Sequence, residues 1–149
     1  MSDVTPGYTL SARSPQGYDD TVERVRALLA DAGFGVLTEI DLKATLKAKL
    51  DVDVAPQVIL GACRPQLAHQ ALAADPSVAA LLPCNVVVRE DADGVVVEAF
   101  DPQAMITMTD AGDAVCEVAN DARVRLQGML AALADEQTDG RTGRTDGQG

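Results

Sequence analysis

Two cysteines and their neighbours are the residues best suited to chemistry. Cys63 follows the apolar run Val58–Ala62 and precedes Pro65, whereas Cys84 follows Pro83 and opens a Val-rich segment. Proline suits the first turn of a helix because it lacks an N–H group, so we expect a helix to begin at Pro65. If the strands that carry the two cysteines are neighbours, their sulfur atoms could approach each other. Such a pair could bind a soft metal or serve as a nucleophile or redox group.

The position of Cys63 before a helix affects the charge that its sulfur can carry. Unpaired backbone N–H groups at a helix N-terminus stabilise a negative charge, and the adjacent Arg64 acts in the same direction. We therefore expect the thiolate of Cys63 to be favoured over that of an ordinary buried cysteine. Cys63 is the candidate catalytic nucleophile, and Cys63 and Cys84 are the candidate metal ligands. Free cysteines are also among the most often buried residues, so both could instead belong to the core.

Other residues near the cysteines could complete a site. Asn85 could hold a ligand or cap a turn. Met105 and Met108, which follow Asp101-Pro102, could supply thioether ligands or fill gaps in a core. His69 is the only histidine, and its position predicts a surface residue. The candidate ligand-binding residues are Cys63, Arg64, Pro83, Cys84, Asn85 and Met105.

The composition excludes several classes of function. The formal charge of −11 opposes binding to nucleic acid or to an anionic membrane surface. Aspartate is preferred over glutamate and lysine is scarce, which is typical of a salt-loving host or a GC-rich genome. No apolar run approaches the length of about 18 residues that a membrane helix needs. Three cysteines form no disulfide framework, so we expect reduced thiols and a cytoplasmic protein. No zinc, calcium or nucleotide motif identifies a cofactor.

The pattern of apolar residues predicts one α+β domain over residues 8–135, with mobile segments at residues 1–7 and 136–149. Its expected element order is β-α-β-α-β-α-β-β-α. The chain should form a mixed sheet of about five strands with helices packed on one side or both. The clearest hairpin surrounds the turn Asp91–Gly94, and Asp41 can cap a second helix that contains Leu42, Leu46 and Leu50. The last helix should run from about Asp113 to Leu133. Its buried face should contain Val115, Val118 and Ala122, and Asp121 and Arg125 are available as an outer ion pair.

Several segments together resemble the family known as domain of unknown function 302. They are Gly33–Asp41, Gly61–Pro65 with Ala68, Asp75-Pro76, and Leu81–Val88, and the resemblance covers about Thr21 to Leu133. It implies a compact α/β domain that forms a dimer, and it implies no established activity. The family pattern includes the positions of Cys63, Pro65, Pro83, Cys84 and Met105.

The leading hypothesis is a small cytoplasmic homodimer that binds a small ligand or a soft metal in a pocket near Cys63, Pro83 and Cys84. A second hypothesis is a thiol-dependent redox or transfer enzyme in which Cys63 attacks and the helix N-terminus steadies negative charge. A third is a purely structural homodimer whose cysteines are core residues. No base that would activate Cys63 is evident in the sequence.

Overall fold

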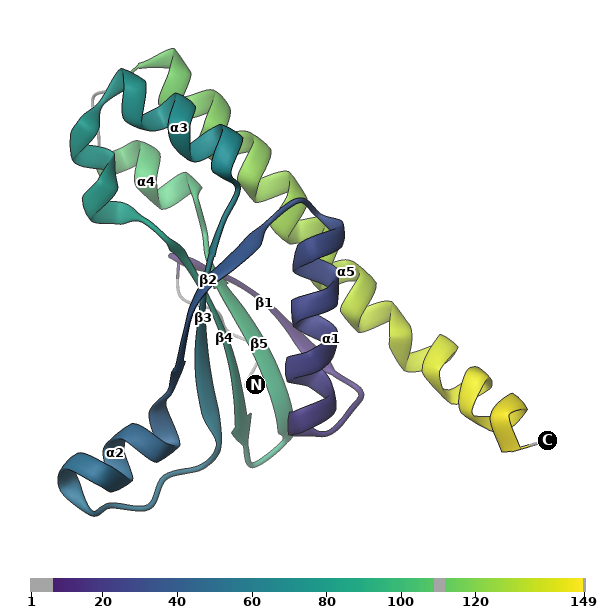
Figure 1. Cartoon of the computed structure of the whole chain (residues 1–149). Helices are drawn as coiled ribbons and strands as arrows, with labels where there is room; N and C mark the ends of the chain where they lie inside the picture. The colour runs from purple at the N-terminus through teal and green to yellow at the C-terminus, as the bar shows by residue number, and fades with distance from the viewer. Residues whose placement is uncertain (1–6, 109–111, 149) are drawn as a thin grey trace.

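The computed structural model describes the backbone of residues 7–108 and 112–148, and side chains as far as Asp135. It contains one five-stranded sheet in the order β1-β5-β4-β3-β2. The strands are β1 (Thr9–Ser14), β2 (Gly35–Asp41), β3 (Gln57–Cys63), β4 (Cys84–Asp91) and β5 (Gly94–Phe100). The helices are α1 (Tyr18–Asp31), α2 (Leu42–Leu50), α3 (Pro65–Ala74), α4 (Gln103–Met108), α5 (Asp113–Gln148) and the 3-10 helix η1 (Pro76–Leu81). The predicted α+β class is confirmed (Figure 1).

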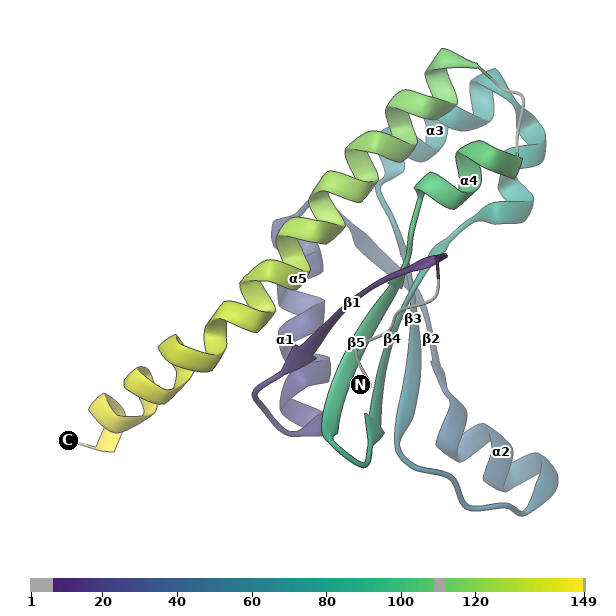
Figure 2. The same ribbon diagram turned by 180° about the vertical axis from the view of Figure 1, so that it is seen from behind.

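The prediction of a mixed sheet is wrong, because all four strand pairings are antiparallel. The reason lies in the connections between strands. The helices α2 and α3 lie beyond the two ends of the sheet, so each returns the chain beside the strand it left (Figures 1 and 2). Only α1 crosses the sheet, and it joins the two edge strands β1 and β2, which are not paired with each other.

Several local predictions are confirmed. Pro65 is the first residue of α3, and the Asp41 carboxylate caps α2 by accepting a hydrogen bond from the backbone N–H of Ala44. The β4–β5 hairpin turns between Asp91 and Gly94, which adopts a positive φ of 130°. The short helix α4 was not anticipated. Residues 1–6 lie outside the described part of the chain, and the mobility of residues 136–149 stays a prediction.

The main core lies between one face of the sheet and the helices α1 and α5, which lie on the same side of it (Figures 1 and 2). Alternate residues of the strands point into this core, as the period of two requires. Val86 and Val88 on β4 are fully buried there, beside Leu29 of α1 and Leu126 of α5. A second, smaller cluster lies at one end of the sheet and contains Ala71, Val78, Met105, Val115 and Val118.

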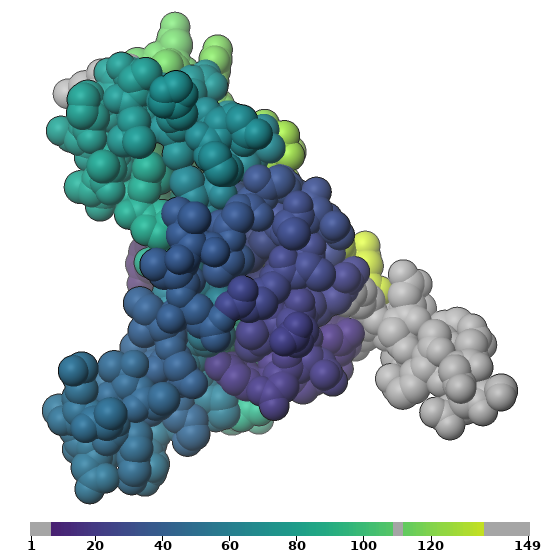
Figure 3. All heavy atoms as spheres, in the orientation of Figure 1, coloured from purple at the N-terminus to yellow at the C-terminus, as the bar shows by residue number. Residues whose placement is uncertain are grey.

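The helix α2 projects from the body of the protein (Figure 3). None of its residues is buried. Leu37 and Ile40 on the adjacent edge strand β2 are exposed, as are Leu50 and Val52 at the end of α2. The described part of β2, α2 and the residues after α2 therefore exposes four large apolar side chains.

Candidate functional site

The two cysteines lie at the ends of adjacent strands. Cys63 is the last residue of β3, and Cys84 is the first residue of β4. The strand register pairs Cys84 with Ala62, the residue immediately before Cys63. The predicted neighbourhood of the two cysteines is therefore confirmed. Both are free thiols.

A small cavity lies where the main core meets the second cluster, and it brings together four of the six predicted ligand-binding residues. Its volume is about 30 Å³, and its walls come from β3, β4, α3, η1, α5 and the start of α4. The predicted residues on its wall are Cys63, Arg64, Cys84 and Met105. The other lining residues are apolar: Phe34, Ala62, Leu67, Ala68, Ala71, Val78, Leu82, Pro102, Val118, Ala119 and Ala122.

Pro83 and Asn85 do not line this cavity. Asn85 is exposed and is paired with Gly61 across β3 and β4. Because successive strand residues point to opposite faces, an inward Cys84 turns Asn85 outward. Pro83 has a packing role, since a Cβ atom added at Gly61 would come within 2.8 Å of its Cγ and would overlap Oγ1 of Thr38. The strands can approach here only because residue 61 is glycine.

Burial raises the pKa of both cavity thiols. The pKa of Cys84 is raised to about 11, first by desolvation and second by the charge of Cys63. The pKa of Cys63 is also raised by desolvation. The predicted preference for a Cys63 thiolate over that of an ordinary buried cysteine stays a prediction, and burial opposes it because apolar walls disfavour the charged sulfur. At neutral pH both sulfur atoms carry their protons.

Arg64 joins the cavity to a charged cluster at the end of α1. Its Nε atom is buried, has no hydrogen-bond partner, and lies 3.6 Å from Oδ2 of Asp121. The same carboxylate oxygen accepts a hydrogen bond of 2.7 Å from Nε of Arg125, which confirms the predicted Asp121–Arg125 pair. Arg125 also donates from Nη1 to the carbonyl of Ala32. Two arginines thus share the carboxylate of Asp121.

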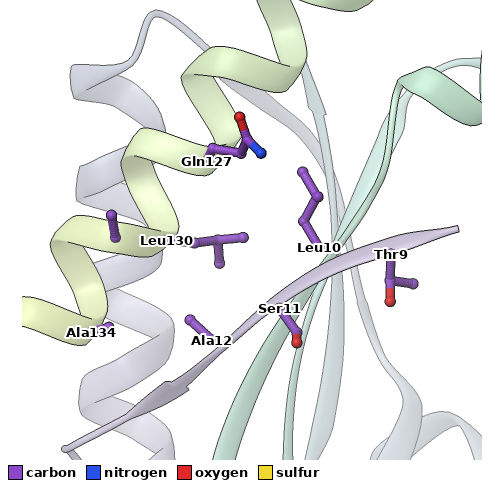
Figure 4. Close-up of a pocket in the computed structure, with 8 residues that line it drawn as sticks. Thr9, Leu10, Ser11, Ala12, Gln127, Leu130 and Ala134 are labelled. Atoms are coloured by element: carbon purple, nitrogen blue, oxygen red, sulfur yellow. The ribbon is translucent and has the colours of Figure 1, made fainter. Parts of the chain in front are cut away.

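A wider hollow lies between the edge strand β1 and α5 (Figure 4). Its volume is about 470 Å³. Leu10 and Ala12 point from β1 toward α5, where Leu130 and Gln127 face them (Figure 4). Thr9, Ser11, Ala131 and Ala134 complete the lining, and no lining residue is charged or contains sulfur. The hollow therefore offers no group for metal binding or acid–base chemistry.

Clusters of conventional metal ligands are absent from the described residues. No group of three His, Cys, Asp or Glu side chains there could hold a metal ion. His69 is exposed on α3, and Met108, with 58% of its surface exposed, lies away from the cavity that contains Met105. The sulfur-bearing residues that line the cavity are Cys63, Cys84 and Met105.

Sequence reasoning missed the apolar residues that shape the cavity. Phe34 precedes β2, Leu67 lies on α3, and Val118 lies on α5. The helical spacing of Val115, Val118 and Ala122 predicted only that this face of α5 is buried. Nothing in that spacing indicates that Val118 and Ala122 meet the cysteines.

The fold and the cavity together define a small α+β protein in which Cys63, Cys84 and Met105 line one largely apolar cavity. A model of the family described as "Domain of unknown function DUF302" matches residues 10–133. The chain belongs to this family. A solved structure, the "uncharacterized conserved protein DUF302 from Bacillus stearothermophilus", is similar with a TM-score of 0.77 and 29% sequence identity. The match covers 86% of this chain and 99% of that one.

The comparison with curated proteins finds no match. Among the described residues, no helix is both long enough and apolar enough to cross a membrane.

Proposed function

We propose that the protein binds one soft metal ion through the sulfur atoms of Cys63, Cys84 and Met105. The single observation that carries this proposal is that these three residues line one cavity. Thiolates and thioethers are the ligands that soft ions such as Cu(I) prefer, so binding would release the thiol protons of Cys63 and Cys84 to solvent. Met105 is only 3% exposed, so its sulfur lies in the protein interior rather than in water.

The volume of the cavity favours an ion over an organic ligand. The cavity has a volume of about 30 Å³, which is about the volume that one water molecule occupies in the liquid. Pockets that bind small organic molecules have volumes of about 300 to 1,000 Å³. An organic ligand would have to separate α3 from α5. A single metal ion requires only small side-chain movements.

The thiol-enzyme hypothesis receives less support. A nucleophilic cysteine needs a lowered pKa or an adjacent base, but burial raises the pKa of Cys63. None of the residues that line the cavity is His, Asp or Glu. The purely structural hypothesis explains the burial of Cys84 and of Met105. It predicts no retention of a metal ion.

Native mass spectrometry of the protein titrated anaerobically with Cu(I) tests the proposal. We expect the mass of one copper ion per chain, retained against a weak Cu(I) chelator. Cys63→Ser, Cys84→Ser and Met105→Leu should each weaken retention. Cys116→Ser and Met108→Leu are matched controls, because neither residue lines the cavity, and they should bind like the unmodified protein. Equal retention by Cys84→Ser and Cys116→Ser would refute the proposed site.

We also propose that the protein works in a reducing compartment such as the cytoplasm, because its cysteines are free thiols.

We further propose that the protein is a homodimer. The projecting edge supports the dimer, since Leu37 is 63% and Leu50 is 66% exposed there. Sedimentation analysis should find a dimer, which Leu37→Glu with Leu50→Glu should dissociate. Val124→Glu, at an equally exposed position on α5, is the control. A chain that is monomeric at every concentration would contradict this proposal.

A further inference from the structure

We infer that the open edge of β1 is a docking site for an extended, uncharged segment of another protein chain. The site is the hollow between β1 and α5, away from the cysteines (Figure 4). The segment would pair with β1 as a sixth strand of the sheet, which is the binding mode known as β-augmentation.

The backbone groups of β1 alternate between the neighbouring strand and the open edge. β1 is an edge strand that pairs with β5, and the N–H of Asp101 donates to the carbonyl of Tyr8 at the start of this pair. In an antiparallel ladder every second residue bonds to the partner strand, so Tyr8 and Leu10 bond toward β5. The N–H and C=O groups of Thr9 and Ser11 therefore point away from β5. No described residue hydrogen-bonds to these four groups.

The hollow provides room for an added strand beside this edge. The two residues with unpaired backbone groups both line the hollow, whose volume is about 470 Å³. Ala131 and Ala134 on α5 are exposed there, and their small side chains leave space for those of an incoming strand. Leu10 and Ala12 point from β1 toward α5 (Figure 4). Because strand side chains alternate between two faces, every second side chain of an added strand would likewise contact α5.

The lining determines the chemistry of the segment. None of the eight lining residues is charged, although charged residues make up 23% of the chain. A charged side chain that entered the hollow would lose hydration without gaining an opposite charge. The unpaired backbone groups of β1 require N–H and C=O groups at the spacing of an extended chain. The occupant is therefore a polypeptide strand whose side chains toward α5 are uncharged.

A second copy of this chain is a less suitable occupant. The proposed homodimer uses exposed residues of β2 and α2, and β2 lies at the opposite edge of the sheet. If copies also paired through β1, each molecule would have two different self-contacts, and the copies would form an open chain instead of a closed dimer. The β1 edge is thus left for a different partner. This choice of occupant rests on the proposed homodimer, whereas the open edge and the hollow do not.

Amide hydrogen exchange, measured by NMR with and without synthetic peptides, tests the docking site. The probes are acetylated and amidated seven-residue peptides in which valine or alanine alternates with threonine. We expect them to slow exchange at the N–H groups of Thr9 and Ser11 by about 10-fold or more. Exchange at Leu10, whose N–H already faces β5, should not change. Matched peptides with three consecutive central lysines or aspartates, which place a charge toward α5 in either register, should bind about 10-fold more weakly or less.

Two variants locate the binding on the protein. Ser11→Pro removes an N–H group that an added strand needs, and an edge strand tolerates proline where its N–H faces outward. Ala131→Arg places a charge in the hollow, and it replaces Ser11→Pro if thermal melting shows that the proline variant does not fold. Each should weaken peptide binding by about 10-fold. Val124→Arg, at an exposed position of α5 outside the hollow, is the matched control and should bind like the unmodified protein.

The other outcomes would overturn the docking site or its occupant. No binding of any uncharged peptide, or equal binding by Ala131→Arg and Val124→Arg, would refute the site. Slow exchange at Ser11 without peptide would show that the edge is already filled in the free protein. Self-association that Ser11→Pro abolishes would identify a second copy as the occupant. Leu37→Glu with Leu50→Glu should bind the peptides normally, so a failure of the proposed homodimer is distinguishable from a failure of this site.

Discussion

Cys63 and Cys84 lie near enough in the fold for the charge of one to raise the pKa of the other. The register of β3 and β4 produces this relationship, because Cys84 pairs with Ala62 and Cys63 is the next residue in the chain. The two thiols therefore form one chemical unit, although 20 residues separate them in the sequence. A change at either sulfur should alter the behaviour of the other.

The raised pKa of Cys84 predicts how stability depends on pH. Burial raises this pKa from 9.0 to about 11, so the folded protein keeps a proton that the unfolded chain loses first. The contribution of the buried neutral thiol to the free energy of unfolding is thus complete below about pH 9. This contribution is lost as the pH rises toward 11, and the loss is at most about 3 kcal/mol. Urea unfolding of the metal-free protein at pH 8 to 11 measures this loss.

Cys84→Ala supplies the comparison for that measurement. Other groups also titrate above pH 9, including Tyr18, whose pKa is raised mainly by desolvation. The prediction therefore concerns the slope of the free energy of unfolding against pH. This slope should be steeper for the unmodified protein than for Cys84→Ala. Parallel slopes over this range would show that Cys84 ionises in the folded protein as readily as in the unfolded chain.

Thiol reactivity should follow the same cause. At pH 7 we expect slow alkylation by iodoacetamide at both cavity cysteines, with Cys63 faster than Cys84 because Cys63 is only partly buried. The rate at each cysteine should rise with pH as its thiolate forms. Urea-unfolded protein gives the reference rate. Rapid alkylation of folded Cys63 at pH 6 would mean that its pKa is lowered, and the thiol-enzyme hypothesis would regain support.

The parts of this site that the sequence predicted are those that depend on near neighbours in the chain. A proline after Cys63 identified the start of α3, and an aspartate identified the start of α2. The alternation of strand residues also implies that Cys84 and Asn85 face opposite sides, although both are among the predicted ligand-binding residues. The walls that Phe34 and Val118 supply could not be predicted, because they depend on how α5 and the segment before β2 pack together.

The same limit explains the incorrect prediction of a mixed sheet. Whether a helix crosses the sheet or extends beyond its end depends on the packing of its apolar face, so the element order did not distinguish a mixed sheet from an antiparallel one. The pKa of Cys63 depends on the balance between a helix N-terminus and apolar walls. Only the helix N-terminus can be recognised in the sequence near Cys63, because the apolar walls come from distant parts of the chain.

Gly61→Ala should destabilise the protein by about 1 to 3 kcal/mol, because its methyl group would overlap Thr38 and approach Pro83. Gly128→Ala is the matched control: its methyl group meets no atom within 4 Å, and alanine favours the helix α5 by up to about 1 kcal/mol. Urea unfolding measures both. The double variant Gly61→Ala with Thr38→Ala should recover part of the loss, and no recovery would argue against the contact with Thr38.

Leu126→Ala should cost about 2 to 5 kcal/mol, because Leu126 is fully buried between α5 and the sheet. Val124→Ala, two residues earlier on the same helix, changes an exposed side chain and should alter stability by less than about 0.5 kcal/mol. Chemical unfolding of both variants provides the measurement. Similar losses at the two positions would contradict the orientation of α5.

Gly33→Ala should displace Arg64 without changing its charge. Gly33 has a φ of 92°, and an added Cβ would lie 2.5 Å from Nη1 of Arg64. Gly112→Ala is the control, because Gly112 has a φ of 83° and no atom within 4 Å of an added Cβ. Both variants should lose about 1 to 2 kcal/mol from the left-handed backbone.

Only Gly33→Ala should also disturb the ion pair between Arg64 and Asp121, because only its added methyl group meets the guanidinium group. We therefore expect Gly33→Ala to lower the free energy of unfolding by more than Gly112→Ala does, as measured by urea unfolding of both variants. Equal losses would show that the guanidinium group moves aside without affecting stability.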